Sequence, residues 1–301
     1  MSILIDTDAG VDDMLALFLL FSLAPAGSVD IGVTYGNVPL ERAIRNVALF
    51  AQLSGRAPQR VLRGAAGPLH GKALAATDVH GDDGLGGVTH TKYRDAAGLA
   101  TDDLASAVQE ARYQRMIAIG PLTDLRLIAS RDASAPLLIM GGAFERPGNM
   151  SPYAEFNIFS DPDAAAEVFE NWPAAIRVVP LDLSHQVTLQ RAWLGAVSAR
   201  HAAPVAAFLR DIHQHYMDVY GGREGIDGCH PHDALAVFAS FFPDALEWRR
   251  GRVRIVTEGE QRGRTVLTPD TEGRHYVARS IDQKRFFDVL ERAFSSAARL
   301  V

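Results

Sequence analysis

The sequence predicts an α/β fold in which helices cover a mostly parallel central sheet. Through the first 180 residues, short apolar runs alternate with helix-like stretches, which is the pattern of a covered parallel sheet. Several of the apolar runs end in a polar or glycine-rich turn. No internal repeat, low-complexity tract or linker divides the chain, so we expect one domain over residues 1–301.

The expected elements of this first part follow from apolar runs and from helical periodicity. The predicted strands are Ile3–Asp6, Ile31–Tyr35, Arg115–Ile119, Leu137–Met140 and Ile176–Val179. The predicted helices are Asp12–Ser22, Leu40–Ser54, Thr101–Ala111, Leu122–Ser130 and Pro162–Glu170. In open α/β sheets, ligands bind outside the carboxyl ends of the strands, so the turns that follow these strands should converge on one crevice.

The last third of the chain has a different order of elements. It predicts helices, then a small strand region and a closing helix, at about Ala202–Tyr220, His232–Phe241, Val253–Thr257, Arg264–Leu267, His275–Ala278 and Gln283–Ala297. The stretch "GGREGIDG", residues 221–228, predicts a flexible segment between the two helices.

Composition excludes some classes of partner. The net charge of −6 and the lack of a basic cluster argue against a nucleic-acid partner. Cys229 is the only cysteine, which excludes an internal disulfide and favours a reducing compartment, so we expect a cytoplasmic protein. The longest apolar run, Met14–Ala24, is about half of the roughly 20 residues that a membrane span requires, so we expect neither a signal peptide nor a membrane anchor.

The stretch "LIDTDAGVDD", residues 4–13, places four aspartates between an apolar strand and an apolar helix. Helix capping explains one or two of them, at Asp12 or Asp13. Asp6 and Asp8 are two apart on an extended segment and therefore share a side, and Gly10 allows a tight turn between the pairs. A hard cation such as Ca²⁺ or Mg²⁺ fits this set of carboxylates, although the spacing is not that of an EF-hand loop.

Further polar residues follow other predicted strands or begin helices. Asp233 begins an apolar helix in "GCHPHDALAVFA" and is either a cap or a ligand, while the adjacent His232 is either a surface residue or a proton donor. Asn37 ends the second strand. His80 lies in the glycine-rich "DVHGDDGLGG", which lacks the lysine of a phosphate loop.

Two other groups of residues could contact sugar hydroxyls or a planar ring. Asn149, Glu155 and Asn157, in "GNMSPYAEFN", offer the donors and acceptors that sugar hydroxyls need, although a solvated loop has the same composition. Tyr216 and Tyr220 are four apart on one helical face, where they pack in the core or stack on a planar base beside a mobile lid.

Together these motifs resemble the inosine-uridine preferring nucleoside hydrolase family over nearly the whole chain. "DTDAGVDD" is similar to the family's amino-terminal aspartate signature, which usually has Pro where Ala9 stands. The motifs that follow in family order are "GN" at 36–37, "HGDDG" at 80–84, "GPLTD" at 120–124, "GNMSPYAEFN" at 148–157, "LDLSHQ" at 181–186 and "HD" at 232–233.

The resemblance implies a single Rossmann-like domain, a homodimer or homotetramer, and a Ca²⁺ ion bound at the strand ends. The implied metal ligands are Asp8, Asp13, Asp233 and the backbone carbonyl of Ile119. The implied contacts to the ribose hydroxyls are Asp12 and Asn157 for the 2′-hydroxyl, Asn149 and Glu155 for the 5′-hydroxyl, and Asn37 in the ribose pocket. Asp6 resembles the family's supporting aspartate behind the metal ligands.

Two positions depart from the family pattern. Ala9 replaces the usual Pro, which we expect to loosen the turn while leaving the ligands in place. Asp124 replaces a common Asn in "GPLTD" and adds negative charge near a helix start.

The resemblance implies hydrolysis of ribonucleosides to ribose and free base. Ca²⁺ would lower the pKa of a bound water and Asp8 would take its proton, while surrounding carboxylates stabilise an oxocarbenium-like transition state. His232 is the first candidate for protonating the leaving base and His80 the second. Family members with broad or pyrimidine preference carry His in the "HG" loop, whereas the purine-specific group has Trp, so His80 predicts the broad or pyrimidine class.

Two alternative functions remain open from the sequence. One is a Mg²⁺-dependent phosphoester hydrolase with Asp6 or Asp8 as nucleophile, which would need a lysine that no motif supplies. The other is a nucleoside-binding or sugar-binding protein without catalytic activity.

Overall fold

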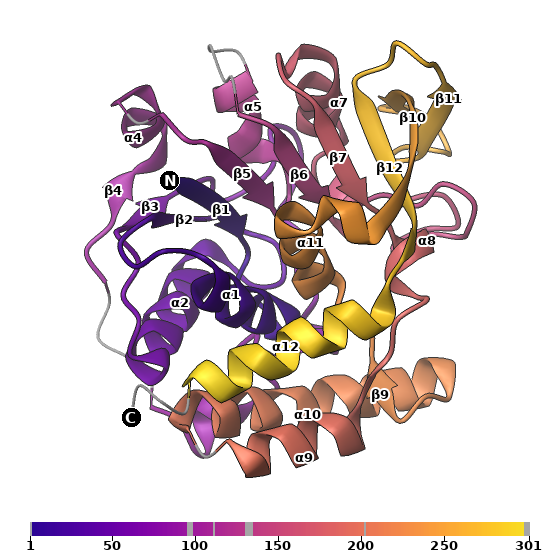
Figure 1. The fold of residues 1–301 in the computed structure, drawn as a ribbon. Helices are drawn as coiled ribbons and strands as arrows, with labels where there is room; N and C mark the ends of the chain where they lie inside the picture. The colour runs from indigo at the N-terminus through magenta and orange to yellow at the C-terminus, as the bar shows by residue number, and fades with distance from the viewer. Residues whose placement is uncertain (1, 95–98, 111, 130–134, 202, 298–301) are drawn as a thin grey trace.

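One ten-stranded sheet runs through the computed structural model, which describes residues 2–94, 99–110, 112–129, 135–201 and 203–297 (Figure 1). Its order is β11-β10-β12-β7-β6-β5-β1-β2-β3-β4. The strands are β1 Ile3–Thr7, β2 Val29–Val33, β3 Arg60–Arg63, β4 Asp102–Asp103, β5 Arg115–Ala118, β6 Leu137–Met140, β7 Ile176–Val179, β10 Leu246–Ile255, β11 Thr265–Pro269 and β12 His275–Ile281.

Within this sheet, neighbouring strands from β12 to β4 pair in parallel, and the β10 pairings with β11 and β12 are antiparallel. The predicted α/β class with a mostly parallel sheet is therefore confirmed. The C-terminal strands extend this sheet at one edge, because β12 pairs with β7. A separate two-stranded pair consists of β8 Leu189–Gln190 and β9 Gly228–Cys229.

Helices cover both faces of the sheet and form two hydrophobic cores. The helices are α1 Val11–Leu23, α2 Leu40–Ser54, α3 Thr77–His80, α4 Leu104–Glu110, α5 Thr123–Ala129, α6 Phe156–Ser160, α7 Pro162–Asn171, α8 Leu181–Ser184, α9 Arg191–Arg200, α10 Pro204–Glu224, α11 His232–Phe241 and α12 Gln283–Ala297, with short 3₁₀ turns at Val88–His90 and Pro243–Ala245. The larger core contains side chains of α1, α2, α10, α11 and α12, and the smaller core those of α4, α5 and α7.

Helix α1 is apolar on nearly every side because it is enclosed on nearly every side. All its residues from Val11 to Phe21 are buried, and it packs against α2, α10, α11 and α12, with α12 lying across it in Figure 1. The apolar run that begins at Met14 is thus a core helix. No helix in the described ranges combines the length and apolar character that spanning a membrane would require.

Most predicted elements match the structure, with differences at short strands and helix ends. Strands β3 and β4 were not predicted, because β3 has two apolar residues between two arginines and β4 consists of two aspartates. The start of the predicted helix Thr101–Ala111 is wrong, since Asp102–Asp103 form β4 and the helix begins at Leu104. The predicted helix that ends at Tyr220 continues to Glu224, so the first half of the predicted flexible segment is helical and ends at Gly225, whose φ is 71°. The predicted helix ends at Ala111 and Ser130, and the predicted start at Ala202, lie outside the described residues.

Candidate active site

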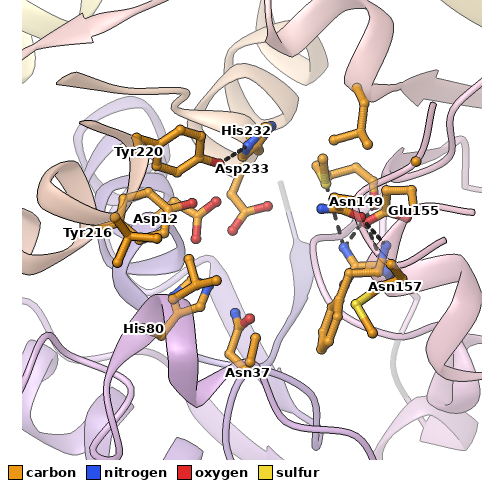
Figure 2. Close-up of a pocket in the computed structure, with 18 of the residues that line it drawn as sticks. Asp12, Asn37, His80, Asn149, Glu155, Asn157, Tyr216, Tyr220, His232 and Asp233 are labelled. Carbon is orange, nitrogen blue, oxygen red and sulfur yellow. Dashed lines mark hydrogen bonds between the residues drawn. The ribbon is translucent and has the colours of Figure 1, made fainter. Parts of the chain in front are cut away.

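A cavity of about 420 Å³ opens at the carboxyl ends of β1, β2, β5 and β6, within the size range of small-molecule sites. The turns that follow these strands form part of its wall, and α10 and α11 form another part. In Figure 2, Asn149 and Glu155 lie across the cavity from Asp12 and Tyr220. The sequence-predicted site residues that line it are Asp12, Asn37, His80, Ile119, Asn149, Glu155, Asn157, Tyr216, Tyr220, His232 and Asp233. The two others, Asp8 and Asp13, are fully buried behind this wall.

An acidic cluster stands at one end of the cavity. Asp12, Asp13 and Asp233 each offer an oxygen within 4.8 Å of the others, and Figure 2 shows the carboxylates of Asp12 and Asp233 directed toward each other. The first turns of α1 and α11 bring these residues together, because the two helices pack side by side. Among the ion pairs of the described residues, none joins a lysine or arginine to this cluster.

Asn37 holds Asp8 next to this cluster. The Asn37 backbone N–H donates to Asp8 Oδ2 at 2.7 Å, and its Nδ2 donates both to Asp8 Oδ1 and to Asp13 Oδ2 at 3.0 Å. Asp13 also accepts from the Thr7 hydroxyl at 2.5 Å and from the Gly10 N–H at 2.8 Å. A Cβ atom at Gly36 would lie 2.0 Å from Asp8 Oδ2, so the "GN" turn requires glycine there.

The carboxylates of this region cannot all be charged without a positive partner. Burial raises the pKa of Asp8, Asp13 and Asp233, and the adjacent carboxylates raise that of Asp8 and Asp233 further. The pKa of Asp12 rises to about 8, through burial and then the charge of Asp13. A divalent cation would remove this repulsion, and an all-oxygen set of donors suits a hard ion.

Asp6 lies behind the cluster, on β1. Neither of its carboxylate oxygens has a hydrogen-bond partner among the described residues, and burial, followed by the charges of Asp124 and Asp13, raises its pKa. Asp124 is itself buried, and it accepts from the Ala65 N–H at 2.9 Å. The expected extra charge near a helix start is therefore a buried carboxylate bound to a neighbouring loop.

The segment of residues 149–157, across the cavity from the acidic cluster, presents amide and carboxylate groups that the backbone holds in place. Glu155 caps α6, since it accepts from the N–H groups of Asn157 at 2.8 Å, Ile158 at 3.1 Å and Gly142 at 2.9 Å. Asn149 Oδ1 accepts from the Phe156 N–H at 2.9 Å. These contacts fix the orientation of both side chains toward the cavity.

The side chain of Asn157 contacts the backbone of Ile119 at the edge of the cavity. Asn157 Nδ2 donates to the carbonyl oxygen of Ile119 at 3.1 Å and to that of Met140 at 3.2 Å. A carbonyl oxygen has two lone pairs, so the Ile119 carbonyl retains one for a second partner. The structure thus brings the predicted backbone ligand to the cavity, beside one of the predicted ribose contacts.

His232 and Tyr220 form a hydrogen-bonded pair on the helical wall. The His232 ring lies 2.6 Å from Ser184 Oγ through Nδ1 and 2.8 Å from the Tyr220 hydroxyl through Nε2 (Figure 2). Burial lowers the pKa of His232 well below its usual value, so the ring is neutral. Both ring nitrogens are engaged, and the hydroxyl of Tyr220 occupies the position beyond Nε2.

His80 is also a neutral imidazole, with a known tautomer. Its Nδ1 accepts from the Val11 N–H at 3.0 Å, so its proton resides on Nε2. Burial lowers its pKa to about 3. Its ring packs against Tyr216 with centroids 5.0 Å apart. A Cβ atom at Gly10 would lie 2.6 Å from His80 Nδ1, so this glycine makes room for the histidine and not only for the turn.

Two features of the site were missed or misread from sequence. Ser184 lies in the "LDLSHQ" motif, but the sequence indicates no role for it, because only the folded chain brings it to His232. Ala9 was expected to loosen its turn, but its N–H donates to Thr7 Oγ1 at 3.1 Å and its carbonyl accepts from Asn46 Nδ2 at 3.0 Å. Its φ of 53° is positive, which proline cannot adopt, so the expectation of a loose turn is wrong.

Comparisons with known proteins agree with the geometry. The family model described as "Inosine-uridine preferring nucleoside hydrolase" matches residues 3–288. The chain is 32% identical over 277 residues to "Uridine nucleosidase 1" of Arabidopsis thaliana, covering 88% of this chain and 81% of that protein.

Two solved structures share the fold over almost the full length. A "Purine-Preferring Ribonucleoside Hydrolase" from Gardnerella vaginalis superposes with a TM-score of 0.89 at 24% identity, covering 100% of both chains. A plant nucleoside hydrolase superposes with a TM-score of 0.86 at 28% identity, covering 98% of this chain and 99% of that one.

Proposed function

Because the chain belongs to the inosine-uridine preferring nucleoside hydrolase family and is a hydrolase of N-glycosyl compounds, we propose that it is a Ca²⁺-dependent ribonucleoside hydrolase. The observation that supports this most strongly is a single cavity walled by buried carboxylates, by amide and carboxylate groups, and by neutral imidazoles and phenols. These three surfaces match a metal with its water, a ribose and a nucleobase. Family membership also disfavours the phosphoester hydrolase and the sugar-binding protein, and no lysine is found among the described residues that line the cavity.

Asp8, Asp13, Asp233 and the Ile119 carbonyl are the proposed ligands of the ion. When bound, a divalent cation acts as a Lewis acid that lowers the pKa of water in the site. Asp8 is the proposed base, and Asn37 orients it by two hydrogen bonds. Asp12 also contributes an oxygen to the same cluster, at the cavity surface, where it is positioned for a sugar hydroxyl.

The ribose is proposed to lie between the acidic cluster and the wall formed by residues 149–157. Asp12 and Asn157 would bind the 2′-hydroxyl, Asn149 and Glu155 the 5′-hydroxyl, with Asn37 below the ring. Negative charge around the sugar also stabilises the positive charge that develops on the ring as the C–N bond breaks.

The nucleobase is proposed to lie against α10 and α11. A neutral His232 is a poor acid by itself, so we assign the contact with the base to the Tyr220 hydroxyl, with His232 and Ser184 behind it. His80 would donate a hydrogen bond from Nε2, and Tyr216 packs against it. The histidine at position 80 supports a broad or pyrimidine preference, as does the name of the Arabidopsis relative, whereas the Gardnerella protein is named for purines.

We also propose that residues 1–301 form one domain, since one sheet contains strands from Ile3 to Ile281. A cytoplasmic location and assembly as a homodimer or homotetramer remain proposals from sequence and resemblance.

A nucleoside panel tests the activity and the metal together. Purified protein is incubated with uridine, cytidine, inosine, adenosine and deoxyuridine, and the reducing sugar is measured before chelation, after chelation, and after adding Ca²⁺ or Mg²⁺ back. We expect release of ribose that chelation abolishes and Ca²⁺ restores, fastest with uridine. Turnover unaffected by exhaustive chelation would reject the metal, and faster release from purine nucleosides would reject the base preference.

A further inference from the structure

A second group of metal-binding side chains lies at the edge of the cavity, outside the acidic cluster. It consists of His185, just after α8, Glu224, the last residue of α10, and His230, between β9 and α11. Each offers one nitrogen or oxygen, and these atoms all lie within 4.8 Å of one another. His185 and the stretch 224–230, which are distant in sequence, therefore converge on one point.

Both imidazoles are held in the orientation of metal ligands. Nδ1 of His185 lies 3.0 Å from the carbonyl oxygen of Leu181, and Nδ1 of His230 lies 2.7 Å from that of Val187. A carbonyl oxygen only accepts, so each Nδ1 carries a proton, and Nε2 is the nitrogen of each ring that can bind a metal once it is deprotonated. Histidines that bind metals through Nε2 have this arrangement, with Nδ1–H donating to a backbone carbonyl or carboxylate.

Both Nε2 atoms face the same carboxylate. His230 Nε2 lies 3.1 Å from one oxygen of Glu224, and His185 Nε2 lies 3.6 Å from the other. In a tetrahedral zinc site with bonds of about 2.0 Å, neighbouring ligand atoms are about 3.3 Å apart, and the two nitrogen–oxygen distances are close to that value.

The exposure of the three side chains and the charges around them favour a metal site that is open to solvent. The side chain of His230 is 5% exposed, that of His185 14% and that of Glu224 34%, so the imidazoles are packed while the carboxylate faces outward. His185 and Glu224 line the mouth of the cavity. Arg146 is the nearby positive charge that opposes a cation, and Glu224 offsets it. Arg223, the neighbour of Glu224, is paired with Asp78.

We propose that His185, Glu224 and His230 bind a second divalent ion of the borderline class, such as Zn²⁺ or Co²⁺. Two imidazoles and one carboxylate suit these ions, whereas Ca²⁺ favours sites made only of oxygen ligands. Three protein ligands leave a position open toward the cavity. The ion would connect the end of α10, one turn after Tyr220, to the segment that carries His232. This inference does not depend on the proposed nucleoside hydrolase activity.

Cobalt spectroscopy tests the site on full-length, tag-free protein saturated with Ca²⁺. We expect one Co²⁺ per chain with the visible absorption of a four- or five-coordinate ion, displaced by one equivalent of Zn²⁺ and not by further Ca²⁺. His230→Asn and Glu224→Gln should each weaken Zn²⁺ binding by about 100-fold or more, measured by equilibrium dialysis.

A matched control and two contrary outcomes make the test decisive. His90→Asn, at an exposed histidine far from the cluster in sequence, should bind Zn²⁺ as the parent chain does. Circular dichroism of each variant without added metal checks the fold, and Glu224→Gln changes a part-exposed side chain that the core does not need. Absence of Co²⁺ uptake by the parent chain, or equal Zn²⁺ affinity in the parent and both cluster variants, would overturn the proposal and leave a histidine–carboxylate ion pair.

Discussion

The two walls of the cavity are built in different ways. On the strand-end wall, formed by the turns that follow β1, β2, β5 and β6, backbone N–H groups hold many of the polar side chains, as when Gly10 donates to Asp13 or Asn37 donates to Asp8. On the helical wall, side chains hold one another across long stretches of sequence, as in the contacts from Ser184 to His232 to Tyr220. The first wall is therefore held largely by the backbone of the strand-end turns, and the second exists only after the helices have packed.

This difference suggests that the strand-end wall binds the ribose, which all ribonucleosides share, and that the helical wall binds the nucleobase, which varies. Backbone contacts are the same whatever the neighbouring side chains are, so the strand-end wall can keep one geometry. Contacts between side chains change when one partner changes, so a substitution such as one at Tyr220 can alter the base site while Asp8 and Asp13 keep their backbone contacts. Asp233 is the exception, because it begins α11 and also belongs to the acidic cluster. The predictions below test whether the two walls separate in this way.

The largest effect should come from the strand-end wall. Asp8→Ala removes the proposed base and a metal ligand, so kcat should fall by at least about 10²–10⁴-fold for every nucleoside. Asp244→Ala, at an exposed carboxylate far from the cavity, is the control and should keep normal turnover. Steady-state kinetics on uridine and inosine measures kcat, and circular dichroism verifies that each variant folds. An Asp8→Ala enzyme with near-normal kcat would contradict the assignment.

Metal removal should change how stability depends on pH. The pKa values of Asp8, Asp12, Asp13 and Asp233 are raised in the folded chain, that of Asp12 to about 8, so the folded state binds protons more tightly than the unfolded state. The stability that this contributes is present below about pH 4 and is lost as pH rises toward 8.

Thermal melts of chelated protein between pH 5 and 8 should accordingly show a melting temperature that falls with pH. Other groups also titrate in this range, so the comparison with Ca²⁺-loaded protein is the control. Saturating Ca²⁺ should flatten or reverse the slope, because the ion binds the ionised carboxylates. Parallel slopes with and without Ca²⁺ would show that these carboxylates are not its ligands.

On the helical wall, Tyr220→Phe should affect leaving groups selectively. It removes the hydroxyl that contacts His232 Nε2, so kcat for uridine should fall by about 10²-fold, the lower range for acid–base catalysis. Hydrolysis of p-nitrophenyl riboside, whose leaving group needs no protonation, should change little. Tyr276→Phe, on β12 and outside the cavity, is the matched control. Equal losses on both substrates would assign Tyr220 to general positioning instead.

The contrast between the walls also explains what could be predicted from sequence. The α/β class, most element positions and the polar strand-end residues follow from local patterns, because alternating apolar runs and caps are local. The tautomer of His80, the contact of Ser184 with His232, and the convergence of His185 with His230 depend on packing between distant segments. No single stretch of sequence encodes those contacts.

The smallest predicted effect concerns the turn that begins the acidic motif. Ala9 has a φ of 53°, the only positive value among the non-glycine residues in the described part of the chain. A left-handed conformation costs alanine about 1–2 kcal/mol, which Ala9→Gly would relieve, while the extra freedom of glycine in the unfolded chain and the loss of a buried methyl group offset most of the gain. We expect the free energy of unfolding, measured by urea denaturation, to change by no more than about 0.5 kcal/mol.

Ala16→Gly, inside α1, is the matched control and should lower the free energy of unfolding by at least about 1 kcal/mol, because glycine is unfavourable within a helix. Activity should be retained in Ala9→Gly, since the hydrogen bonds at this position come from its backbone. A loss of stability in Ala9→Gly as large as that in Ala16→Gly would mean that the turn does not hold Ala9 in the left-handed region. Backbone geometry would then contribute less to the structure of the strand-end wall than its hydrogen bonds indicate.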